Sequence, residues 1–204
     1  IATSNGINCI DYKTKKITRF YPKSINKECT TNIINRLLKH SDGNVYAFCN
    51  RSVFKCSMNQ TVETVFPDIA IPSPTYSVAQ APDKDIYIGT ESNGLYIYSE
   101  NWKLKKHVPI DGIIATILPD NNGDIWLGLD ETGICLFNKN KQTFTWLHKD
   151  NTNLNNNSIR TFVSYGDSSI LVGTFRGLNI LNKKELTITP ANINIAGKGG
   201  LSHY

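Results

Sequence analysis

The stretch Asn122-Gly-Asp-Ile-Trp-Leu-Gly128 joins a polar turn to an apolar strand, and its pattern recurs along the 204-residue chain. Three other copies are Asp42-Gly-Asn-Val-Tyr-Ala-Phe48, Asp83-Lys-Asp-Ile-Tyr-Ile-Gly89 and Asp167-Ser-Ser-Ile-Leu-Val-Gly173. The fourth residues of the copies, called the anchors below, are spaced by 41, 39 and 45 residues: Val45, Ile86, Ile125 and Ile170. A repeat of about forty residues is the sequence signature of a propeller or a solenoid.

Two further columns of residues accompany the anchors. An apolar residue lies 8 positions before each anchor: Leu37, Val78, Ile117 and Phe162. A glycine follows three of the anchors by 7 or 8 positions: Gly94, Gly133 and Gly177. A tight hairpin needs positive φ here, which glycine adopts without a Cβ clash. Ser52 takes this place in the first full repeat, so we expect that hairpin to be built differently.

Each repeat is predicted to hold four short strands, A to D, rich in β-branched and aromatic residues and separated by turns. Strands such as Ile125-Trp-Leu127 are apolar on both faces, as a sheet packed between two other sheets requires. The sequence therefore predicts an all-β fold, a β-propeller of four-stranded antiparallel blades, with a solenoid as the alternative. We interpret the strand B column of Tyr46, Tyr87 and Trp126 as packing between blades, with stacking on a sugar as the alternative.

The repeat also predicts the blade boundaries. We expect a blade remnant, four whole blades and the start of another, at 1–30, 31–70, 71–110, 111–155, 156–195 and 196–204. A seven-bladed ring would need about 290 residues, so the chain is predicted to be a fragment of such a larger ring. The alternative is a five-bladed ring that the C-terminal tail completes.

Three consecutive segments resemble one known repeat family. Asn122-Gly-Asp-Ile-Trp-Leu-Gly-Leu-Asp-Glu-Thr-Gly133 resembles the "DGNxWIGT…GGL" core of the two-component regulator propeller repeat. The next segment, Phe137-Asn-Lys-Asn-Lys-Gln-Thr-Phe144, is similar to its "FDPKTGKF", and Asp150-Asn-Thr-Asn-Leu-Asn-Asn-Asn-Ser-Ile-Arg160 is similar to its "DPNNPNSLSSNSIR" linker. The repeat at 31–70 departs from the family pattern, with Phe48 and Ser52 in the two glycine positions.

The resemblance implies a context for the chain. Such propellers usually form the periplasmic sensor region of hybrid two-component histidine kinases, which respond to glycan breakdown products and work as homodimers through the full ectodomain. On this basis we expect an extracytoplasmic sensing segment that binds an oligosaccharide and contacts neither nucleic acid nor membrane. Kinase chemistry would lie elsewhere in the parent protein. The alternatives are a protein-interaction propeller without a signalling role and a propeller glycan lyase or hydrolase.

Charge and motifs do not point to an enzyme or a nucleic-acid binder. The net charge of +5 is mild, and short basic runs at 13–16 and 103–106 are typical of a solvated face. No metal-ligand spacing connects the histidines His40, His107, His148 and His203, and no GxSxG elbow occurs. We therefore expect no catalytic residue, no metal and no cofactor. No apolar run approaches the length of a membrane helix.

The cysteine count is odd and leaves the cellular compartment open. No CxxC motif connects the five residues Cys9, Cys29, Cys49, Cys56 and Cys135. Cys49 and Cys56 flank a predicted hairpin, so a cross-strand contact between them is one possibility. Buried free thiols are the other, and the preferred, interpretation.

Loops on a rigid scaffold are the places where a propeller carries function. The B–C and D–A loops of a propeller share one rim, and here they hold Asn, Asp and Arg residues and one aromatic ring. The predicted ligand-binding residues are Arg51, Glu91, Asp130, Phe175 and Arg176. Arginine can hold the carboxylate or sulfate of an acidic sugar through two hydrogen bonds. The alternative is that these are solvated turns.

Overall fold

The computed structural model describes the chain outside these ranges: 26–28, 51, 58–60, 66–70, 72 and 192–204. The described residues form antiparallel strands and one short helix, α1 (Pro22–Ile25). The chain divides into two compact units, Ile1–Asp111 and Gly112–Tyr204.

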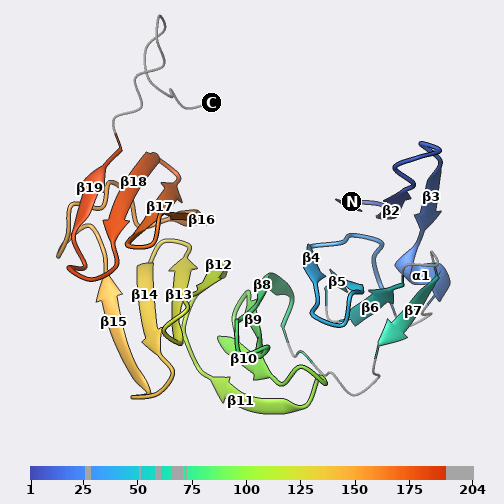
Figure 1. The fold of residues 1–204 in the computed structure, drawn as a ribbon, viewed down its shortest axis with the longest axis horizontal. Coiled ribbons are helices and arrows are strands. Elements are labelled where there is room, and N and C mark those ends of the chain that lie inside the picture. Colours follow the sequence, from blue (N-terminus) through green and yellow to red (C-terminus); the bar gives the residue numbers. More distant parts are fainter. Residues whose placement is uncertain (26–28, 51, 58–60, 66–70, 72, 192–204) are drawn as a thin grey trace, which may run out of the picture. The chain divides into compact units, whose positions relative to one another are not determined.

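The first unit contains three sheets, and in each sheet consecutive strands pair antiparallel (Figure 1). The first sheet comprises β1 (Ala2–Thr3), β2 (Gly6–Ile10) and β3 (Ile17–Phe20). The second comprises β4 (Arg36–Lys39), β5 (Val45–Cys49), β6 (Ser52–Cys56) and β7 (Val62–Val65). The third comprises β8 (Thr75–Gln80), β9 (Ile86–Thr90), β10 (Leu95–Tyr98) and β11 (Leu104–Val108).

The second unit contains two four-stranded sheets with the same simple strand order (Figure 1). One comprises β12 (Ile114–Pro119), β13 (Asp124–Leu129), β14 (Gly133–Asn138) and β15 (Thr143–Leu147). The other comprises β16 (Ile159–Tyr165), β17 (Ser169–Thr174), β18 (Gly177–Asn182) and β19 (Ile188–Pro190). Repeated four-stranded antiparallel meanders of this kind are propeller blades, so the predicted all-β propeller fold is confirmed. The start of a further blade at 196–204 lies outside the described residues, and the seven-bladed ring stays a prediction.

The register of the strands shows that the repeat columns are structurally equivalent. Each strand A residue of the apolar column pairs with the residue two positions after the anchor: Leu37 with Ala47, Val78 with Ile88, Ile117 with Leu127, and Phe162 with Val172. Three anchors are at most 1% exposed, but Val45 is only half-buried. A regular repeat predicts that all four anchors occupy equivalent buried positions. This prediction is wrong for Val45, in the blade that also lacks the family glycines.

The hairpin glycines adopt the backbone conformation that their column predicts. The φ angles of Gly94, Gly133 and Gly177 are +74°, +100° and +112°. In the exceptional hairpin Cys49 pairs directly with Ser52, and the positive φ, +52°, falls on Asn50 instead. Asparagine tolerates this conformation better than most residues do, so that hairpin is built differently, as expected.

The hydrophobic core lies between neighbouring sheets. In the second unit, Trp126 packs in one cluster with Leu154, Phe162 and Ile170, which belong to the next sheet and the loop before it. In the first unit, Tyr46 packs with residues of the following sheet, including Ile86. Inter-blade packing is thereby confirmed for these two members of the aromatic column. It also explains why strands such as β9 are buried on both faces.

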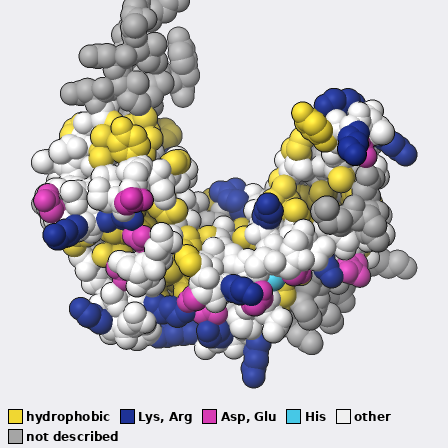
Figure 2. Space-filling view, in the orientation of Figure 1, with side chains coloured by type: hydrophobic (Ala, Val, Ile, Leu, Met, Phe, Trp, Pro, Cys, Tyr) yellow, Lys and Arg dark blue, Asp and Glu magenta, His cyan; other side chains and the backbone are white. Residues whose placement is uncertain are grey.

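The cysteines follow the preferred interpretation in part, and the charged residues of the runs at 13–16 and 103–106 lie on solvated faces. No disulfide joins the five cysteines in this structure; Cys29, Cys49 and Cys135 are buried as expected, but Cys9 and Cys56 are only half-buried. Cys49 and Cys56 do not face each other, because Cys49 pairs with Ser52 and Cys56 with Val45 at opposite ends of the hairpin. The suggested cross-strand contact is therefore wrong. Figure 2 shows basic and acidic side chains interspersed on the face in view.

Candidate functional site

Three loops of the second unit meet at one rim. The β13–β14 turn contacts the β15–β16 loop, where the Gly133 N–H donates to the Asn157 carbonyl at 2.8 Å. The β17–β18 turn contacts the same loop, where the Phe175 N–H donates to the Ser158 carbonyl at 2.9 Å. These backbone hydrogen bonds fix the relative positions of the side chains that the turns carry, as a rigid scaffold for a binding site requires.

A charged and aromatic cluster, formed by Asp130, Arg160 and Phe175, lies at this rim. Arg160 Nη1 donates to Asp130 Oδ2 at 3.0 Å, and the Arg160 Cζ atom lies 5.6 Å from the centre of the Phe175 ring. The Phe175 side chain is 60% exposed. The cluster joins two blades, because Asp130 follows β13 whereas Arg160 and Phe175 come from β16 and the β17–β18 turn.

The cluster offers both polar and apolar contacts. The Arg160 side chain is 46% exposed and the Asp130 side chain 22%. Asp130 Oδ1 is buried and has no hydrogen-bond partner in the described part of the chain. A guanidinium donates up to five hydrogen bonds in a planar fork, and a carboxylate accepts several. An exposed ring flanked by such groups can hold a molecule that has an apolar face and polar edges.

The predicted binding residues do not form one group. Asp130 and Phe175 share the cluster. Arg176 is exposed beside Phe175, and its carbonyl accepts a hydrogen bond from Asn155 Nδ2 at 3.1 Å. Glu91 is an exposed residue of the first unit, whose N–H donates to the Pro74 carbonyl at 3.0 Å. Arg51 lies outside the described residues.

Arg160 belongs to this cluster but is not among the binding residues predicted from the sequence. It is the second residue of β16, whereas the predicted binding residues lie in loops. The available signal was its place at the end of the Asp150–Arg160 linker, where the loop becomes strand A at the rim. The first residues of a strand A can therefore present side chains to a ligand, as the turns do.

The opposite end of the two sheets carries a polar hollow. A cavity of about 590 Å³ is lined by the β12–β13 and β16–β17 turns and by Lys183 and Lys184. Lys183 Nζ lies 3.1 Å from Asp120 Oδ1. Burial alone would raise the pKa of Asp120, but the hydrogen bond from Lys183 contributes most to a net lowering. This ion pair ties neighbouring blades together, so we regard it as part of the scaffold.

The described residues contain neither a metal-binding cluster nor a membrane-spanning helix. Within them, no group of three or more His, Cys, Asp or Glu side chains is placed to hold a metal ion. No helix in this part of the chain has the length and apolar content that crossing a bilayer requires.

Comparisons with known proteins support the fold. A scan against models of protein families and a search of curated proteins find no match. Among solved structures, the chain is similar to the extracellular domain named for a hybrid two-component system of B. thetaiotaomicron. The two are 24% identical, with a TM-score of 0.71 over 95% of this chain and 27% of that domain. A second domain named in this way, from the same organism, is 18% identical, with a TM-score of 0.72 over 88% of this chain and 25% of that domain.

An enzyme shares the fold as well. A catalytically inactive variant of virginiamycin B lyase from Staphylococcus aureus, solved with quinupristin, is 18% identical to this chain. Its TM-score is 0.69 over 93% of this chain and 64% of the lyase. The chain spans about a quarter of the two sensor domains, and a likeness at these identities concerns the fold alone. The fold is that of the sensor region to which the repeat resemblance pointed, and chemistry must be argued from the site.

Proposed function

We propose that this chain is a ligand-sensing segment in the extracytoplasmic domain of a hybrid two-component sensor, and that it recognises a glycan-derived ligand at the rim of its second unit. Two observations support the sensing context: the three repeat segments around 122–160, and the fold shared with extracellular domains of such systems. The proposal includes a homodimer of the complete ectodomain, in which ligand binding changes the arrangement of the two copies.

The single observation that carries the ligand class is the exposed Phe175 ring beside the Arg160–Asp130 ion pair. A sugar ring has an apolar face that packs on an aromatic ring and hydroxyl groups that need donors and acceptors at its edge. Arg160 and Asp130 supply a donor and an acceptor. Arg176, exposed on the same turn, would add a bidentate partner for the carboxylate or sulfate of an acidic sugar.

The site also provides a route from binding to signalling. A ligand that contacts Asp130 and Phe175 together bridges the blade of β12–β15 and the blade of β16–β19. A ligand shifts a conformational equilibrium only as far as its affinities for the two conformations differ. A ligand at this site would therefore favour the arrangement of the two blades that it binds more tightly. In the alternative function, a protein-interaction propeller, the same rim would contact a protein partner and no glycan.

The test is calorimetry on the complete ectodomain, with a neutral and a uronic-acid oligosaccharide of equal length. Phe175→Ala should weaken binding of both about tenfold, equivalent to about 1.4 kcal/mol. Arg176→Ala should weaken only the acidic one. The matched control is Tyr165→Ala, because Tyr165 is a similarly exposed aromatic, at 59%, and ends β16 at the other end of the same sheet.

Equal affinities for wild type, Phe175→Ala and Tyr165→Ala would refute the site. Cleavage of either oligosaccharide by the purified protein would instead support a lyase or hydrolase, the second candidate, since a lyase shares the fold. The sequence carries no metal-ligand spacing, nucleotide motif or nucleophile elbow, and we therefore expect binding without turnover.

A further inference from the structure

Two cysteines of the first unit come together at one end of the β4–β7 sheet. Cys49 ends β5 and Ser52 begins β6, and the two residues are direct partners in the hairpin. Directly paired residues of antiparallel strands point to the same face. Cys29 precedes β4, and its Sγ lies 3.4 Å from Ser52 Oγ. The Cys29 thiol therefore reaches the face on which the Cys49 side chain lies.

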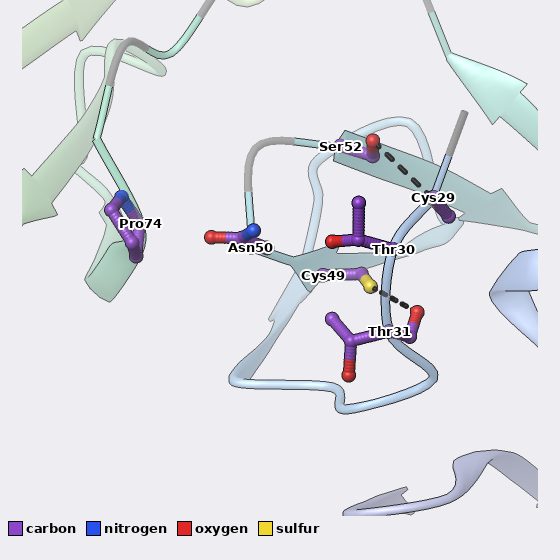
Figure 3. A pocket seen from close by; sticks show the side chains of 7 residues that line it. All are labelled: Cys29, Thr30, Thr31, Cys49, Asn50, Ser52 and Pro74. Carbon is purple, nitrogen blue, oxygen red and sulfur yellow. Dashed lines mark hydrogen bonds between the residues drawn. The ribbon is translucent and has the colours of Figure 1, made fainter.

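A second contact brings the two segments together from the other side. The Cys49 thiol donates a hydrogen bond to the carbonyl of Thr31 at 3.3 Å, and Thr31 is two residues after Cys29. Figure 3 shows both hydrogen bonds, which run between the segment before β4 and the β5–β6 hairpin in opposite directions. Each thiol is thus held against the segment that carries the other.

The surroundings of the pair are apolar on one side and hollow on the other. Cys49 is 1% and Cys29 9% exposed, and both belong to a core cluster with Ile7, Ile34 and Phe54. A cavity of about 360 Å³ is lined by the two cysteines together with Thr30, Asn50 and Pro74, among others. The two cysteines therefore border open space on one side and the core cluster on the other.

We propose that Cys29 and Cys49 form a disulfide bond when the protein folds in an oxidising compartment. The reaction is thiol–disulfide exchange. Each cysteine gives up one proton and one electron as the Sγ–Sγ bond forms, and the disulfide of an oxidoreductase or of oxidised glutathione is reduced to two thiols. The bond would fasten the segment that enters β4 to the rim end of β5.

The surroundings also indicate when the bond forms. Burial, together with the neighbouring Cys29, raises the pKa of the Cys49 thiol to about 12. Because the thiolate is the reactive species, exchange in the folded protein is slow at neutral pH. Oxidation therefore belongs to the folding chain, before the apolar side of the sheet is covered. Its closed loop of about twenty residues restricts the unfolded chain.

The test is refolding of the purified protein in a buffer of reduced and oxidised glutathione, followed by alkylation of free thiols, digestion with trypsin and mass spectrometry without reduction. Trypsin places the four cysteines of the first unit in separate peptides, 1–13, 28–36, 40–51 and 56–84. We expect 28–36 linked to 40–51 with the other cysteines alkylated. The melting temperature of the oxidised protein should be about 5–10 °C above that of the same protein after dithiothreitol treatment.

Cys29→Ser and Cys49→Ser should each abolish the linked species, whereas the control Cys9→Ser should leave it intact. Alkylation of all five cysteines in the refolded wild type, or a link through Cys9 or Cys56 in place of this pair, would overturn the proposal. The melting comparison uses one protein in two redox states, so it does not depend on whether a variant folds. The two proposals fail separately. If the sensing function is wrong, calorimetry will detect no ligand binding, but the disulfide-linked peptides will still be found.

Discussion

Gly133→Ala is expected to destabilise the second unit strongly, because it violates two requirements of one hairpin. Gly133 begins β14 with a φ of +100°, a conformation that residues with a Cβ rarely adopt. A Cβ at this position would lie 2.5 Å from the carbonyl oxygen of Leu147 and 3.2 Å from the Cβ of His148. Leu147 ends β15, so the obstacle is the backbone of a paired strand and cannot rotate away.

The magnitude follows from these two contributions. The unfavourable backbone conformation costs about 1–2 kcal/mol. Moving the end of β15 and weakening the 2.8 Å hydrogen bond from Gly133 to Asn157 adds about 1–2 kcal/mol. The total of about 2–4 kcal/mol corresponds to a fall in melting temperature of roughly 5–12 °C for a chain of this size.

Gly166→Ala is the matched control. Gly166 also lies in the second unit with positive φ, +65°, but a Cβ there would meet no atom within 4 Å. Only the backbone cost of about 1 kcal/mol remains. The assay is urea unfolding followed by tryptophan fluorescence, since Trp126 and Trp146 lie in this unit. Equal losses of stability in the two variants would refute the steric argument.

Two further predictions concern charged groups. Burial alone would raise the pKa of Asp42, but hydrogen bonds from the Asn44 N–H and then the Tyr46 hydroxyl, both at 2.8 Å, lower it to about 2. The stabilisation is therefore present above about pH 4 and lost as the pH falls towards 2. Asp42→Asn should lower the free energy of unfolding, measured with urea at pH 7, by about 1 kcal/mol after allowance for solvent screening. An equally large decrease at pH 2 would contradict this assignment, because Asp42 is then losing its charge. Lys183→Met should cost about 2 kcal/mol, because it leaves the mostly buried Asp120 without its cation. The control is Lys184→Met, because Lys184 is the exposed neighbour of Lys183. If the ion pair is the cause, this substitution should change the free energy of unfolding by less than about 0.5 kcal/mol.

Features that depend on a few neighbouring residues were predictable from the sequence. The strand order within a blade and the glycine conformations follow from the repeat, because a hairpin is determined by its own turn and strands. The different hairpin at Ser52 was predictable for the same reason. The exposure of Val45 was not predictable, because it depends on which residues of other segments cover that strand. Cys49 and Cys56 do not contact each other because of the register in which β5 and β6 pair, and their spacing in the sequence did not specify that register.

The sequence by itself determined the class of fold and the rim on which ligand-binding residues were sought, because both follow from the periodic pattern of apolar and turn residues. Only the tertiary structure decided which side chains meet. It brought Arg160 between Asp130 and Phe175, and it brought Cys29 to the end of the hairpin that carries Cys49. Both groupings join segments 15 to 30 residues apart through hydrogen bonds between loops and strand ends. The periodic pattern predicts that blades pack on one another, but it does not specify which loop and strand-end side chains then come into contact.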